Sequence, residues 1–132
     1  MAALTDRHLA GLLAVRNAIA AFERTAGRES RAAGVTHVQH HALLSLRGHP
    51  EVAGPRVADV AHALSIASPS AVELVARMVS AGLLSRRPDA ADGRVTRLRL
   101  TDLGERLMHQ LGEAHLPRLR ELTSRGVLLL AD

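Results

Sequence analysis

The chain of 132 residues lacks several residue types, and each absence narrows the chemistry that it can carry out. It has no cysteine, which excludes disulfide bonds, thiolate metal ligands and thiol-based redox sensing. It has no tryptophan or tyrosine and one phenylalanine, although 47% of its residues are hydrophobic. The core must therefore be built from aliphatic side chains, and we expect residues 1–132 to form a single domain.

Lysine is absent as well, so arginine supplies all 17 of the Lys and Arg charges in a chain with a formal net charge of +4. Arginine binds phosphate and guanine through two parallel hydrogen bonds, which favours a nucleic-acid partner. A GC-rich genome would produce the same preference for arginine over lysine. The position of the arginines in the fold is therefore more informative than their number.

Motifs for catalysis and for membrane insertion are also missing. The sequence contains no Gly-x-Ser-x-Gly, no His-Glu-x-x-His and no glycine-rich phosphate loop, so we expect neither an enzyme nor a bound cofactor. The N-terminal residues do not form a signal peptide, and the apolar run at residues 9–15 ends at Arg16, too soon to span a bilayer. The sequence thus predicts a cytoplasmic protein without a membrane partner.

A helix is predicted to begin near Ser68, where two N-terminal signals overlap. Pro69 suits the first helical position, since its missing amide donor has no partner there. Ser70 and Glu73, three residues apart, have the spacing of a capping box. An apolar stripe at helical spacing follows, and Gly82 is placed to end the helix.

The segments around this helix complete a recognisable order. A short helix over residues 57–64 precedes it, and two short helices joined by a turn form a helix-turn-helix unit, whose second helix enters the major groove of DNA. Two strands follow, at residues 83–87 and 94–100, joined by an acidic tip that contains Gly93. The second strand alternates between an apolar face and an arginine-bearing face. Thr101 is then placed to cap a further helix.

The N-terminal segment is predicted to contain two helices. A helix over residues 6–24, capped by Thr5, has an apolar surface wider than one side of a small domain needs. It indicates either a subunit interface or a central helix buried within the chain. Residues 26–34 are expected to form a polar link, and Thr36 with Gln39 has the capping-box spacing for the next helix.

The remaining segments contain a loop and a final helix. Residues 51–56 include a Gly-Pro pair and are expected to form a loop, with a minimal strand against the wing as an option. The helix after Thr101 is predicted to stop or kink at Pro117, because proline lacks an amide donor and clashes with the preceding turn. A short second piece would follow it.

This pattern resembles the multiple antibiotic resistance regulator (MarR) family of winged helix transcription factors, over about residues 35–111. The residues that carry the resemblance are Gln39, Leu43, Leu44, Val60, Ala61, Leu64, Ser70, Ala71, Val72, Arg77, Gly82, Leu83, Arg86, Arg87, Asp89, Asp92, Arg94, Leu100, Thr101 and Gly104. The expected fold class is mainly α with a small β-wing. A winged helix-turn-helix core over residues 35–100 would lie between dimerisation helices at residues 5–25 and 101–130.

The resemblance also implies a function. It implies a homodimeric, ligand-responsive repressor that binds a pseudo-palindromic operator in double-stranded DNA and is released by a small-molecule effector. The effector pocket is expected between the dimerisation helices and the DNA-binding part, with an aliphatic lining. The break predicted at Pro117 departs from the longer terminal helices of the family.

The predicted recognition helix supplies the first group of DNA-binding candidates, because hydroxyls and free amides at a helix N-terminus contact phosphates and base edges. They are Ser68, Pro69, Ser70, Val72, Glu73 and Arg77. Two structural interpretations stay open beside this one. Glu73 can instead belong to the capping box, and Arg77 can instead form an ion pair that only stabilises the helix.

The predicted wing supplies the second group. Arg94 at its tip is placed to enter a narrow minor groove, where the negative potential is strongest, and Asp92 can orient it or hold the turn. The alternative is a solvated turn arginine. Further arginines on the strands are expected to contact phosphates, or else to form a merely solvated face. These are Arg86, Arg87, Arg97 and Arg99.

Two other functions remain open. His37 and His41 lie one helical turn apart with His40 beside them, a spacing that can hold a metal in a metal-responsive sensor. Two histidines without a carboxylate or thiolate ligand form a weak site, and no metal ligand is predicted. The same fold can also serve as a protein-interaction module that never contacts DNA.

Overall fold

The computed structural model describes residues 3–130, with side chains through residue 124. Five helices and a two-stranded antiparallel ribbon make up this part of the chain, which confirms the predicted fold class. In chain order they are α1 (Asp6–Ala32), α2 (His37–Arg47), α3 (Val57–Leu64), α4 (Ser68–Ser80), β1 (Leu84–Pro88), β2 (Thr96–Leu100) and α5 (Asp102–Leu130). None of these helices is long and apolar enough to cross a membrane.

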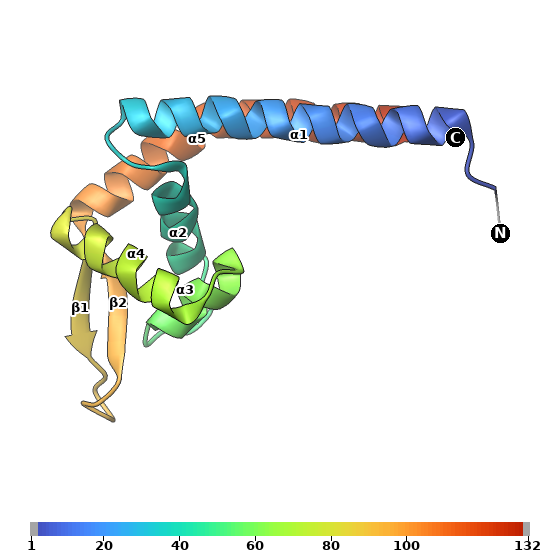
Figure 1. The fold of residues 1–132 in the computed structure, drawn as a ribbon. Helices are drawn as coiled ribbons and strands as arrows, with labels where there is room; N and C mark the ends of the chain where they lie inside the picture. The colour runs from blue at the N-terminus through green and yellow to red at the C-terminus, as the bar shows by residue number, and fades with distance from the viewer. Residues whose placement is uncertain (1–2, 131–132) are drawn as a thin grey trace.

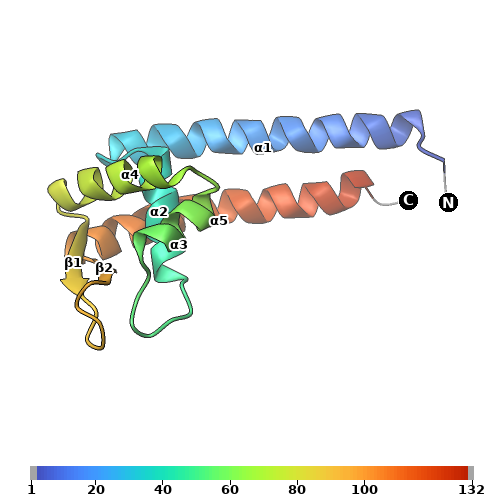
Figure 2. The same ribbon diagram turned by 60° about the horizontal axis from the view of Figure 1, so that its bottom comes forward.

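The elements separate into two regions (Figure 1, Figure 2). The long helices α1 and α5 run side by side and form an arm, with the start of α1 and the end of α5 at its far tip. The shorter helices α2, α3 and α4 gather at the other end, together with the ribbon, which projects away from them. We call these regions the arm and the winged helix.

The winged helix has an aliphatic core, as the composition predicts. Its largest fully buried side chains come from α2, α3, α4, β2 and the turn before β1, and each contributes about 1.5–3 kcal/mol by leaving water. The largest are Leu43, Val60, Val75, Met78, Leu83 and Leu98. A Cβ at Gly104 would lie 2.3 Å from the Leu83 carbonyl oxygen, so α5 can begin this close to β1 only with glycine there.

Helix α1 is longer than predicted. The polar link expected over residues 26–34 is helical through Ala32, and Ala26, Gly27 and Ser30 within it are buried. The Ser30 hydroxyl donates to the Ala26 carbonyl oxygen (2.8 Å), so it needs no solvent. Small residues let α2 and α5 approach α1 closely here, and this packing overrides the weak helix propensity of the segment.

Helix α5 is also longer than predicted, because Pro117 does not end it. Contacts with α1 hold the helix around the proline: Arg118 pairs with Glu29, and His115 Nε2 lies 3.4 Å from Glu29 Oε2. The proline removes one amide donor, but packing against a neighbouring helix offsets that loss. The terminal helix of 29 residues is therefore not shortened.

The local end signals are confirmed at several helices. Thr5 with His8 and Thr36 with Gln39 form capping boxes, and Gly82 has a φ of +76° just after α4. Residues 51–56 form a loop and not a strand. One bond still joins this loop to the ribbon, since the Leu98 amide donates to the Pro55 carbonyl oxygen (2.8 Å).

Candidate nucleic-acid interface

The exposed face of α4 contains all six of its predicted DNA-binding residues. Ala71, Val75 and Met78 are fully buried on the opposite face, and that burial fixes the rotation of the helix. The exposed residues are Ser68, Pro69, Ser70, Val72, Glu73 and Arg77. Val72 is 55% exposed, an unusual position for an apolar side chain unless a partner covers it.

Helix α4 uses only one of the two start signals seen in the sequence. Ala67 is the N-cap and Pro69 lies in the first turn, so the helix begins before Ser70 can cap it. Glu73 therefore makes no capping box, and it pairs instead with Arg77 one turn later. The ion pair considered for Arg77 is therefore present, and the capping-box interpretation of Glu73 is wrong. No side chain caps α4, which leaves amides of its first turn open to an anion.

The wing consists of β1 and β2, paired from Leu84 with Leu100 to Pro88 with Thr96. The second strand starts two residues later than predicted because Val95 belongs to the tip turn, where its amide donates to the Asp92 carbonyl oxygen (3.0 Å). The tip is the outermost part of the ribbon, away from the helices (Figure 1).

Arg94 lies at this tip with its side chain 91% exposed. Its Nε and Nη2 donate to the two carboxylate oxygens of Asp92 (3.1 and 3.2 Å), and its backbone amide donates to Asp92 Oδ1 (3.1 Å). The predicted contact between these two residues is therefore present. The hydrogen bonds from Arg94 hold the pKa of Asp92 below its usual value, so the carboxylate stays charged and keeps the guanidinium in place.

The row of exposed arginines is interrupted at Arg97. Arg86, Arg87 and Arg99 are exposed, as predicted, whereas the Arg97 side chain is 16% exposed. Its Nε donates to Asp89 Oδ1 (2.9 Å), and its Nη1 donates to Glu51 Oε2 (3.2 Å) and to the Gly54 carbonyl oxygen (3.0 Å). The loop between α2 and α3 covers this position, so the expectation of a fully open arginine face is wrong here.

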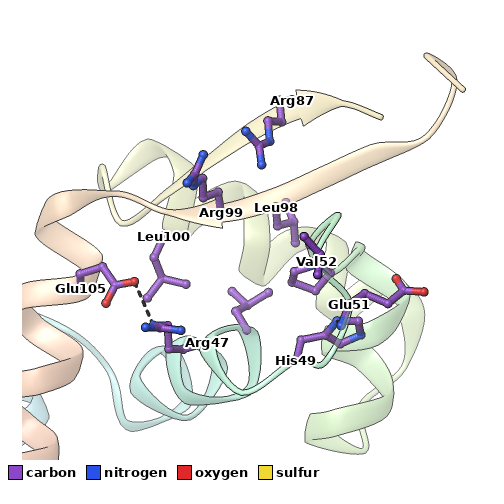
Figure 3. A pocket seen from close by; sticks show the side chains of 12 residues that line it. Arg47, His49, Glu51, Val52, Arg87, Leu98, Arg99, Leu100 and Glu105 are labelled. Carbon is purple, nitrogen blue, oxygen red and sulfur yellow. Dashed lines mark hydrogen bonds and ion pairs between the residues drawn. The ribbon is translucent and has the colours of Figure 1, made fainter. Parts of the chain in front are cut away.

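A hollow of about 390 Å³ lies between the wing, the end of α2 and the loop that follows it (Figure 3). Arg47, Arg87 and Arg99 line it, but so do Glu51 and Glu105, and Arg47 Nε lies 3.3 Å from Glu105 Oε1. The two carboxylates offset much of the positive charge. The sequence did not single out this hollow, because its residues lie far apart along the chain.

A second cavity, of about 330 Å³, lies where the arm meets the winged helix. Its lining differs from the aliphatic one expected for an effector pocket, because four histidines lie there beside apolar residues of α1, α2 and α5. These are His37, His40, His41 and His115. Sequence patterns place the first three on one helix but give no sign that His115 of α5 faces them.

Two of these histidines are deeply buried. His40 is 3% exposed and its ring centroid lies 5.1 Å from that of His115 in an edge-to-face arrangement. Burial, and then the neighbouring His115, lower the pKa of His40 to about 4, and burial lowers the pKa of His115 as well. Both rings are therefore neutral near pH 7. Within the described residues, the buried Nε2 of His40 has no hydrogen-bond partner, and the buried Nε2 of His115 makes no hydrogen bond although it lies 3.4 Å from Glu29 Oε2.

The metal-site alternative gains no support from this geometry. In residues 3–124, where side chains are described, no three His, Asp or Glu side chains are arranged to hold a metal ion. His37 instead pairs with Glu23 of α1. Among these residues, the tertiary structure therefore brings no further ligand to His37 and His41 that would complete a metal site.

Comparison with known proteins confirms the resemblance seen in the sequence. Residues 33–95 match the model of the MarR family. A search of the curated proteins found no match to this chain.

Solved structures share the fold over most of the chain. MepR of S. aureus, in complex with DNA, is 23% identical with a TM-score of 0.71, covering 93% of this chain and 85% of that one. AbsC, a MarR family transcriptional regulator from Streptomyces coelicolor, is 20% identical with a TM-score of 0.72, covering 92% and 82%. A mutant of MarR from E. coli, complexed with operator DNA, is 20% identical with a TM-score of 0.69, covering 93% and 86%.

Proposed function

We propose that this chain, whose residues 33–95 match the model of the MarR family, is a sequence-specific DNA-binding transcriptional regulator. The observation that carries the proposal is the exposure of the whole outward face of α4 beside a wing whose tip presents Arg94. Solved relatives of the same fold are described in complex with DNA, which supports this use of the surface.

In the proposed complex α4 lies in the major groove. Its open first-turn amides and the hydroxyls of Ser68 and Ser70 contact phosphates, and Val72 contacts a thymine methyl group. Glu73 and Arg77 reach base edges either as a pair or after separating, since their ion pair is solvent-exposed and costs little to open. Arg94 enters the neighbouring minor groove, with Asp92 holding it.

The arm is the proposed dimerisation element. Helix α1 exposes large apolar side chains at helical spacing, and α5 adds two more, which is more apolar surface than a solvated helix pair needs. These residues are Leu9, Leu12, Leu13, Ile19, Leu116 and Leu119. A second copy of the chain that covers them by two-fold symmetry would present two α4 helices, which favours a pseudo-palindromic operator.

The histidine-lined cavity is the proposed effector site. It contacts α1, α2 and α5 at once, so a bound molecule would change how the arm holds the winged helix. In a dimer that change would alter the spacing of the two α4 helices and release the operator. We propose on this basis a repressor whose DNA affinity falls when a small ligand binds.

Fluorescence anisotropy tests the proposal. The purified chain is titrated into duplex DNA from the region upstream of its own gene and into a scrambled duplex, at two salt concentrations. Tight binding to the first duplex is expected, with affinity that falls steeply with salt and a clear margin over the scramble. Equal and weak binding to both, repeated with duplexes selected from a random library, would overturn the proposal.

A further inference from the structure

Arg97 connects three segments of the molecule that are separate in sequence. Its guanidinium donates to Asp89 at the base of the wing tip, and to Glu51 and the Gly54 carbonyl oxygen in the loop between α2 and α3. The Leu98 amide, next along β2, donates to Pro55 of the same loop. These hydrogen bonds tie the wing to the loop between α2 and α3.

The contacts continue from Asp89 to the tip. The second carboxylate oxygen of Asp89 accepts the amides of Ala91 and Asp92 (3.0 Å each), while its own amide donates to the Val95 carbonyl oxygen (2.8 Å). Asp92 in turn holds both the backbone and the guanidinium of Arg94. An unbroken series of hydrogen bonds thus joins the loop between α2 and α3 to the Arg94 side chain.

Burial separates Arg97 from the other wing arginines. The side chains of Arg97 and Asp89 are 16% and 13% exposed, and the Nε and Nη1 groups of Arg97 already donate to acceptors within the protein. Arg99, two residues further on the same face of β2, is exposed and has no ion pair among the described residues. Arg99 is thus free to reach a phosphate, whereas Arg97 is already engaged within the protein.

We propose that Arg97 is a positioning residue, which sets the direction of the Arg94 tip by holding Asp89 against the loop between α2 and α3. The inference rests on the proposed function, because direction matters only if Arg94 enters a groove. A two-stranded ribbon is flexible by itself, so a tip held in place before binding loses less conformational freedom when the DNA is bound.

The geometry requires arginine and not merely a positive charge. Three acceptors from two segments surround one planar guanidinium: its Nε donates to Asp89 beside the wing tip, and its Nη1 donates to Glu51 and Gly54 of the loop between α2 and α3. Lysine presents a single ammonium group on a flexible stem and cannot reproduce that fork. Arg97→Lys is therefore the informative substitution: a phosphate contact would largely survive it, but this positioning contact would not.

A double-mutant cycle tests the proposal, with full-length chains and a duplex selected from a random library by the wild-type protein. Arg94→Ala is expected to lower affinity about tenfold and Arg97→Lys about fivefold. The double variant should bind no more weakly than Arg94→Ala alone, since a tip without Arg94 has no side chain left to aim. Arg99→Ala is the matched comparison. Its fold-loss of DNA affinity should multiply with that of Arg94→Ala in the double variant, because the two arginines act independently.

Hydrogen exchange without DNA provides the second readout. Arg97→Lys should speed exchange of the Ala91 and Asp92 amides, which Asp89 holds, whereas Arg99→Ala should leave that exchange as in the wild type. Should Arg97→Lys fail to fold by circular dichroism, Asp89→Asn breaks the same ion pair from the other side.

The outcomes separate the possible explanations. The positioning role would be overturned if the fold-loss of DNA affinity in the double variant equalled the product of the losses in Arg94→Ala and Arg97→Lys. Full affinity in Arg97→Lys alone would overturn it as well. Failure of the wild-type chain to select or bind any duplex would instead overturn the proposed function. Loss of affinity that disappears in the Arg94→Ala background, with faster tip exchange, supports the positioning role.

Discussion

The winged helix and the arm bury opposite kinds of side chain. The winged helix packs aliphatic residues such as Leu43 and Met78 at its centre and turns arginines outward. The arm leaves leucines of α1 exposed and buries His40 and His115 where it meets the winged helix. The first region is stabilised within one chain, whereas the second exposes the apolar surface that the proposed dimer would cover.

This difference fits the separate tasks that we propose for the two regions. A closed aliphatic core holds α4 and the wing in a fixed relation, which a DNA-reading surface needs. The junction contains polar rings, unpartnered ring nitrogens and a cavity, so its packing is less favourable and easier to change. We expect mutations in the first region to change stability and those in the second to change assembly and pH response.

The largest effect is expected in the centre of the winged helix. Leu43→Ala removes a fully buried side chain from α2 and should lower the free energy of unfolding by about 2–5 kcal/mol. Urea denaturation followed by circular dichroism measures it. Leu44→Ala, at an adjacent residue that is 46% exposed, is the control and should cost far less; equal losses would contradict the assignment of the core.

The junction should make stability depend on pH. His40 has a folded pKa of about 4 against an ordinary value near 6.5, so the unfolded chain binds the extra proton between these values. Stability is then full above pH 6.5 and falls by up to about 3 kcal/mol as the pH drops to 4. His40→Gln should flatten this part of the profile, measured by urea unfolding at several pH values; an unchanged slope would exclude His40 as its cause.

An acidic substitution on the exposed face of α1 should separate assembly from folding. Leu13→Asp places a charge in the proposed dimer interface, and we expect the dimer dissociation constant to rise at least about tenfold. Analytical ultracentrifugation measures this, with circular dichroism to show that the helices remain. Ala14→Asp, on a less exposed part of the same helix, tests whether the interface lies on the side of α1 that carries Leu13. An equal rise of the dimer dissociation constant in Ala14→Asp and Leu13→Asp would argue against that side.

The smallest difference concerns two capping boxes of the same type. Thr36→Ala removes the cap of α2 inside the winged helix and should cost about 1 kcal/mol of global stability. Thr5→Ala removes the cap of α1 at the far tip of the arm, where fraying of the first turn exposes little, so its cost should be smaller. Parallel thermal melts compare the two, and a larger loss in Thr5→Ala would show that the arm folds with the core.

Prediction from sequence succeeded where the signal is local. The starts of α1 and α2, the glycine after α4 and the contact between Asp92 and Arg94 all depend on residues within a few positions of one another. Prediction failed at the end of α1 and for a helix stop at Pro117, and it did not foresee the histidines in the cavity. Each of these depends on packing between α1 and α5, which are separated by most of the chain.

The sequence by itself determined the order of the elements, the outward face of α4 and the tip that presents Arg94, because helix periodicity, strand alternation and caps act over a few residues. Only the tertiary structure decided that Arg97 faces the loop between α2 and α3, and that His115 meets His40. Those pairings join residues far apart in the chain, and their energy depends on burial and distance, which no local pattern encodes.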